Sequence, residues 1–242
     1  MTRNRAAGLV LAVAVLLCAS TTGVASAALP EFSAPGGFPV KFKGTSGAAA
    51  LEKVDVHCSS STSEGELVST KSAKKVIVRF KGCKLMFLSL GFPCHSLGAK
   101  AEEVVTPNLQ GKAVYIKEAA PKEAGVVYQA EGGGWLARFE CVIMEGVEKE
   151  TETVVVDGLV IAKVPAKNAK GEEQYDRELT SLEEVFAQKE GAQVPGEYVE
   201  EGFKVKATPS CELKAGEGGA TGSCGLEYAN KLETAAKVEF KV

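Results

Sequence analysis

Apolar and polar residues alternate along most of this chain, the pattern of β-strands that bury one face and expose the other. In one segment Val76, Val78 and Phe80 alternate with neighbours that are charged except for Ile77, and in another Trp135 and Phe139 fall on the apolar side. The alternating segments lie at residues 38–42, 54–58, 76–80, 135–143, 203–207 and 236–242. We therefore expect strands at these positions, with Trp135 facing the core.

Turn-forming sequences separate these segments, including Gly132-Gly133-Gly134 and the glycine-rich stretch 216–222. Asp157-Gly158 predicts either a two-residue hairpin turn or a bulge within one long strand. The competing helix signal, Ser181-Leu182-Glu183-Glu184, has capping-box spacing but could equally be a strand. The expected fold is mainly β, an antiparallel sandwich or barrel with disulfides.

The N-terminus has the organisation of a secretory signal peptide over residues 1–27. Arg3 and Arg5 precede an apolar run, and Ala25-Ser26-Ala27 offers small residues to signal peptidase, so Ala28 is the expected mature start. Lipidation at Cys18 is a rival, but Leu17 is bulkier than the residue that precedes a lipidated cysteine. We expect a mature chain without a transmembrane segment, secreted or associated with the cell wall.

A polar stretch at residues 165–171 is the best internal boundary. It divides an N-terminal β unit, residues 28–164, from a C-terminal β unit, residues 172–242. A chain of this length could also form one β domain, so both arrangements stay open.

The net charge of the whole chain is −3, and loss of residues 1–27 removes two arginines and no acid. A mildly acidic chain is unlike a dedicated nucleic-acid-binding protein, and we expect no nucleic-acid partner. Asp occurs only at positions 55, 157 and 176, which disfavours Asp-rich calcium loops. No metal site and no cofactor is predicted.

Six of the seven cysteines follow the predicted cleavage site. An even number in an exported chain indicates disulfides, and the lack of Cys-x-x-Cys disfavours a redox motif or the commonest zinc spacing. Alternation places Cys58 and Cys141 on inward faces, so they are paired first. Local pairing is the simplest for the rest, Cys83 with Cys94 and Cys211 with Cys224, although other pairings are open.

Four sequence segments resemble a family of secreted actinobacterial β proteins of uncharacterised function. They are Leu29-Pro30-Glu31-Phe32-Ser33, Phe80-Lys81-Gly82-Cys83, Pro93-Cys94, and the stretch Asn108-Leu109-Gln110-Gly111-Lys112-Ala113-Val114-Tyr115-Ile116. The resemblance implies export and a β fold, and it supplies no catalytic residue.

Asp55 and His57 are the best enzyme candidates, with a nucleophile from Ser59-Ser60-Ser61 in a hydrolase. On one strand face, residues two apart lie about 7 Å from each other, too far for a direct hydrogen bond. An ordinary exposed Asp and His is the simpler interpretation.

The chain has no acid between Glu66 and Glu102, but it has seven cations there. Lys75, Ile77, Arg79 and Lys81 fall on one predicted strand face. This face is either simply solvated or a site for an anionic cell-envelope polymer.

The function best matched by these observations is a non-enzymatic extracellular β protein that acts in binding or in the cell envelope. The alternatives are a secreted hydrolase that uses Asp55 and His57, and an inhibitor-like module.

Overall fold

The computed structural model describes residues 30–143, 150–215 and 218–242. These residues form antiparallel strands and contain no helix, so the mainly β prediction is confirmed, in its barrel form. The predicted signal peptide and Cys18 lie outside the described residues. Ser181-Leu182-Glu183-Glu184 belongs to a twelve-residue strand, Glu178–Lys189, in which the alternate residues Leu182, Glu184 and Phe186 are buried.

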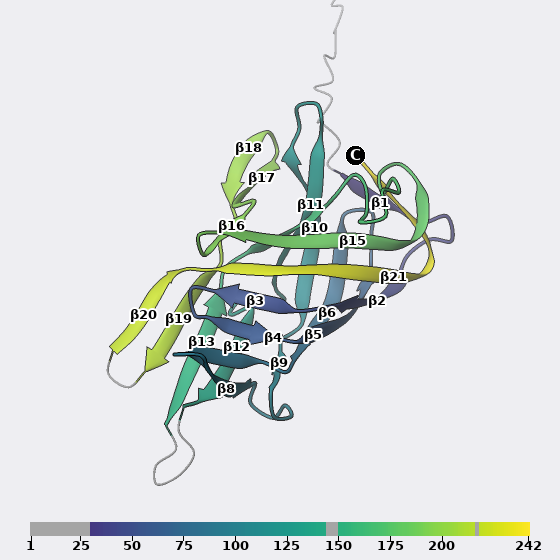
Figure 1. Cartoon of the computed structure of the whole chain (residues 1–242). Coiled ribbons are helices and arrows are strands. Elements are labelled where there is room, and N and C mark those ends of the chain that lie inside the picture. The colour runs from purple at the N-terminus through teal and green to yellow at the C-terminus, as the bar shows by residue number, and fades with distance from the viewer. Residues whose placement is uncertain (1–29, 144–149, 216–217) are drawn as a thin grey trace, which may run out of the picture.

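Eight strands close into a barrel in which each is hydrogen-bonded to both neighbours (Figure 1). Around the barrel they follow the order β2, β5, β6, β10, β11, β14, β15, β21 and back to β2. Their bounds are β2 (Val40–Ser46), β5 (Ser60–Leu67), β6 (Ser72–Lys81), β10 (Leu109–Lys117), β11 (Glu123–Ala130), β14 (Val160–Val164), β15 (Glu178–Lys189) and β21 (Gly225–Lys241). The segment 165–171 therefore links two adjacent strands of one barrel, β14 and β15.

Eight further strands form a second sheet, which lies in the lower part of Figure 1 and continues from the start of β21. Their bounds are β3 (Ala49–Glu52), β4 (Val56–Cys58), β7 (Lys84–Phe87), β8 (Leu90–His95), β12 (Ala137–Val142), β13 (Thr151–Asp157), β19 (Ser210–Ala215) and β20 (Gly218–Ser223). From β21 the pairing order is β3, β4, β7, β8, β12, β13, β19, β20. The second sheet shares one apolar core with the barrel interior.

Five short strands lie outside these two sheets: β1 (Glu31–Ser33), β9 (Glu103–Val105), β16 (Ala192–Val194), β17 (Glu197–Glu200) and β18 (Phe203–Lys206). The β17–β18 hairpin pairs with β10 and covers a smaller apolar cluster on the outside of the barrel. β1 pairs with the end of β21, opposite the end that joins the second sheet.

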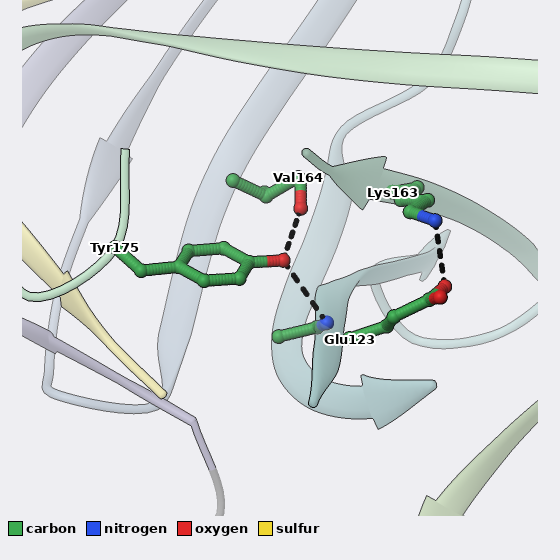
Figure 2. Close-up of polar contacts among 5 residues, drawn as sticks. Glu123, Lys163, Val164 and Tyr175 are labelled. Carbon is green, nitrogen blue, oxygen red and sulfur yellow. Dashed lines mark hydrogen bonds and ion pairs between the residues drawn. The ribbon is translucent and has the colours of Figure 1, made fainter. Parts of the chain in front are cut away.

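Aromatic residues close the end of the barrel at β1. Figure 2 shows the Tyr175 hydroxyl against two barrel strands, where it donates a hydrogen bond to the carbonyl of Val164 and accepts one from the N–H of Ala124 at 3.2 Å. The Tyr175 ring lies 6.0 Å from that of Phe240, which lies 4.9 Å from that of Phe32 on β1. The loop between β14 and β15 is thus fixed to the barrel wall.

Two sequence predictions on this architecture are wrong. Trp135 is 39% exposed, because the turn through Gly132–Gly134 extends to it and the strand begins only at Ala137. Asp157-Gly158 does not join a hairpin, because β13 and β14 pair with other strands and the chain passes here from the second sheet into the barrel.

The six cysteines that follow the predicted cleavage site are all bonded, in the pairs Cys58–Cys83, Cys94–Cys141 and Cys211–Cys224. The third predicted pair is confirmed, and the predicted pairs Cys58–Cys141 and Cys83–Cys94 are wrong. The observed bond Cys94–Cys141 joins β8 to β12, and Cys58–Cys83 joins the end of β4 to the residue before β7; in both the Cα atoms are 4.0 Å apart. Cys94 and Cys141 are direct partners in the β8–β12 register, and Cys58 and Cys83 lie one position beyond the β4–β7 pair His57 and Lys84.

Candidate functional site

A cavity of about 100 Å³ lies in the shared core, between the barrel interior and the second sheet. The barrel contributes aromatic and aliphatic side chains to its wall, among them Phe42, Val76, Val78, Phe80, Phe186 and Leu232. The second sheet contributes residues at its other side, among them Ala49, Leu51, Val56, Ala137, Phe139 and Val156. The cavity is therefore almost wholly apolar and lies where an eight-stranded barrel is known to hold one small ligand.

A cluster of buried polar side chains interrupts this apolar wall. Glu184 of β15 is only 3% exposed, and its Oε1 accepts a hydrogen bond of 2.7 Å from the hydroxyl of Tyr128 on β11. Asn230 of β21, 4% exposed, donates from Nδ2 to the Ser63 hydroxyl of β5 at 3.3 Å. We call Glu184, Tyr128, Asn230 and Ser63 the polar cluster; all four line the cavity.

Strand register brings the polar cluster together. Glu184 shares the inward face of β15 with Leu182 and Phe186, and it is the direct cross-strand partner of Asn230. Gly44 leaves the space that the cluster needs, because a Cβ there would lie 2.1 Å from the Ser63 hydroxyl and 2.7 Å from Asn230 Oδ1.

Burial raises the pKa of Glu184 to about 7, and side-chain hydrogen bonds from Tyr128 and Asn230 oppose that rise. Burial likewise raises the pKa of Tyr128 and of Tyr228, and the Glu184 charge adds to both shifts. At neutral pH the two phenols are therefore neutral, whereas Glu184 is present in both its protonated and its ionised form.

Aromatic packing makes the wall beside the polar cluster rigid. The rings of Phe186 and Tyr228 stack with centroids 4.4 Å apart, and the edge of Phe80 meets Tyr228 at 5.6 Å. Tyr128 stacks on Phe186 at 6.3 Å. Because contacts of this kind fix ring orientation, the Tyr128 hydroxyl is held in place for its bond to Glu184.

Two buried side-chain atoms of the described residues lack a hydrogen-bond partner in the protein, Asn230 Oδ1 and Thr234 Oγ1. Asn230 lines the main cavity, and Thr234 lines a second cavity of about 20 Å³ that also touches Glu184 and Tyr128. Buried polar atoms without partners are uncommon in native proteins and call for a specific explanation.

Asp55 and His57 do lie together, contrary to the expected separation. Asp55 Oδ1 is 2.8 Å from His57 Nε2, because Lys53 and Asp55 adopt positive φ angles of 83° and 52° in a turn before β4. Both side chains are at least half exposed, at 61% and 50%. The hydroxyl of Ser59 donates to the Lys81 carbonyl and that of Ser61 bonds Ser46, so neither hydrogen-bonds His57.

The predicted basic face is exposed on β6, at Lys75, Arg79 and Lys81, with Ile77 half-buried. Strand pairing brings acidic residues that are distant in the sequence beside this basic face. Lys75 Nζ lies 2.6 Å from Glu66 Oε1, and Lys81 is the cross-strand neighbour of Glu103 on β9. The positive charge of this strand is thus partly balanced, and binding of an anionic envelope polymer stays a prediction.

Sequence reasoning missed the polar cluster, although one signal was present. In Leu182-Glu183-Glu184-Val185-Phe186 the alternation places a glutamate on the same side as Leu182 and Phe186. A charged residue at an inward strand position is rarely buried without a special role. The partners Tyr128 and Asn230 had no sequence signal, since only the barrel register brings them to Glu184.

The described ranges contain no group of three or more His, Cys, Asp or Glu side chains arranged to hold a metal ion. Within the same ranges, no helix has the length and apolar character needed to cross a bilayer.

Comparison of the chain with protein-family models, curated proteins and solved structures finds no match.

Proposed function

We propose that this protein is a non-enzymatic binding protein that holds a small, largely apolar molecule in the cavity between its barrel and its second sheet. The observation that carries the proposal is the apolar cavity with the buried carboxyl group of Glu184 in its wall. Ligand sites commonly combine apolar walls with a few fixed polar groups that orient the ligand.

The energetics of burial support this proposal. A buried polar atom without a hydrogen bond costs roughly 1–3 kcal/mol, and packing the core more tightly would avoid the voids. The ionisable Glu184 borders the cavity, and its cross-strand partner Asn230 has an unpaired Oδ1. A bound molecule would fill the void and offer Glu184 a hydrogen bond.

We further propose that binding takes place outside the cytoplasm, in the secreted or wall-associated setting predicted from residues 1–27. Three disulfides support this location, because they persist mainly in oxidising compartments.

A panel of small apolar molecules tests the proposal. Binding of n-butanol, n-butylamine, butyrate and benzene is measured by calorimetry and by NMR chemical-shift changes at the residues that line the cavity. We expect at least one of them to bind with shifts centred on Phe186 and Tyr228.

A filled-cavity variant supplies the control. Val78→Phe puts a ring into the cavity wall, whereas Ile77→Phe adds the same ring on the outward face of the same strand. We expect the first to lose binding and the second to keep it. The proposal fails if none of the panel binds, or if a folded Val78→Phe protein binds as well as the parent.

A further inference from the structure

The cavity wall contains one acidic group and no basic side chain. Among the described residues that line it, the titratable groups are Glu184 of β15, Tyr128 of β11 and Tyr228 of β21, and there is no Lys, Arg or His. Glu184 therefore has no cation in the cavity with which to pair. A buried carboxylate without a cation is costly, and a positively charged ligand would offset part of that cost.

Two hydrogen-bond donors of the polar cluster already have acceptors. The Tyr128 hydroxyl donates to Glu184, and Asn230 Nδ2 donates to Ser63. The acceptor Asn230 Oδ1 has no partner, and Asn230 is the cross-strand neighbour of Glu184. The cavity thus offers the ionisable acceptor Glu184 to whatever occupies it.

We infer that the ligand is a small primary amine with a short apolar body, whose ammonium group binds the carboxylate of Glu184. An ammonium group carries a positive charge and donors but no acceptor, so it complements an ionised carboxyl group that has no cation beside it. The inference rests on the proposed function and specifies its ligand class. Size limits the body, because a cavity of about 150 Å³ holds benzene and this one is about 100 Å³.

Amine binding should displace a proton. Since the pKa of Glu184 is about 7, the group is mostly protonated at pH 6 and mostly ionised at pH 8. An ammonium ion stabilises the ionised form and lowers the pKa, so binding should release most of a proton at pH 6 and little at pH 8. Tyr128 and Tyr228, the other titratable groups on the cavity, stay neutral throughout this range because their pKa values are raised.

The test compares n-butylamine with n-butanol, a neutral molecule of similar size, and with butyrate, an anion. Calorimetry on the disulfide-bonded chain at pH 8 should give at least tenfold tighter binding for the amine than for the alcohol, and no binding of butyrate. Calorimetry at pH 6 in two buffers of different ionisation enthalpy should detect the released proton.

Two matched variants locate the effect. Glu184→Gln removes the charge and keeps an acceptor for Tyr128, and it should reduce amine binding to the level of the alcohol. Glu183→Gln removes a charge from the neighbouring, outward side of β15, and it should change neither amine binding nor alcohol binding. If Glu184→Gln does not fold, titration of the Glu184 carboxyl carbon by NMR in the parent protein, with and without amine, still decides the question.

Each result has a distinct meaning. If the alcohol binds as tightly as the amine, or if the Glu184 pKa does not fall on amine addition, the amine inference is wrong and the binding function stands. An amine preference that survives in folded Glu184→Gln also overturns the inference. If no molecule of the panel binds, the proposed function fails as well.

Discussion

The buried Glu184 makes the stability of the whole protein depend on pH. The folded protein keeps the Glu184 proton up to about pH 7, whereas the unfolded chain releases it near the ordinary value of 4.5. Between these two values the folded state binds more protons, so the free energy of unfolding falls as pH rises. The stabilisation from Glu184 is complete below pH 4.5 and is lost as pH rises through about 7.

The variant Glu184→Gln should remove this dependence. Relative to the parent, it should gain on the order of 3 kcal/mol in free energy of unfolding between pH 4.5 and pH 8, because a pKa shift of one unit corresponds to about 1.4 kcal/mol. Urea unfolding at several pH values measures the difference, and Glu183→Gln is the control. If the free energy of unfolding changes with pH in the same way in the parent and in Glu184→Gln, the burial of Glu184 described above is contradicted.

At the scale of single elements, alternation predicted most strands and their inward faces. Val76, Val78 and Phe80 are buried as expected, and so are Phe139 and Cys141. Alternation identifies the face of a strand and says nothing about its neighbours, which is why inward-facing Cys58 and Cys141 were paired wrongly. Alternation did not predict the backbone geometry before β4 either. The positive φ of Asp55 brings its side chain to His57, and the positions of apolar residues carry no information about φ.

The disulfides differ in the length of chain that they enclose, and this predicts an order of stability. Cys94 and Cys141 are 47 residues apart, and Cys211 and Cys224 are 13 apart. In the chain-entropy account a longer closed loop stabilises more, by about 1 kcal/mol for this difference. The double variant Cys94→Ala/Cys141→Ala should therefore unfold at lower urea concentration than Cys211→Ala/Cys224→Ala.

Hydrogen exchange should also show which strands lose stability when the Cys94–Cys141 bond is removed. The Cys94–Cys141 bond joins β8 to β12, so its removal should speed exchange in those strands and leave the barrel strands β2 and β5 protected. Equal acceleration in β2 and β5 would mean that the second sheet and the barrel open together.

At the scale of the molecule, the cavity lies between the barrel and the second sheet, and one strand, β21, joins the two. β21 pairs with β3 at Gly225–Glu227 and with β15 and β2 from Tyr228 onward. The sequence predicted the segment Ala236–Val242 as a strand, but it could not predict that this strand closes a barrel against β2, far away in the chain. The cavity and the polar cluster depend on that closure, and were therefore not predictable from local pattern.

Deleting residues 225–242 tests this dependence on β21. The shortened chain keeps seven of the eight barrel strands, but β2 and β15 lose their common neighbour, and Glu184 loses its cross-strand partner Asn230. We expect no cooperative thermal transition and strong binding of a hydrophobic dye. A cooperative transition in the shortened chain would show that the barrel forms without its last strand.

The long stretch of sequence between β2 and β21 also sets the order of events during synthesis. Phe42 of β2 pairs with Thr234 of β21, so the barrel cannot close until β21 has left the ribosome. Contacts between such distant residues form slowly. In a chain that is exported as we propose, this late closure of the barrel keeps the chain extended and able to pass a translocation channel. Folding then follows on the far side of the membrane, where the cysteines can also oxidise.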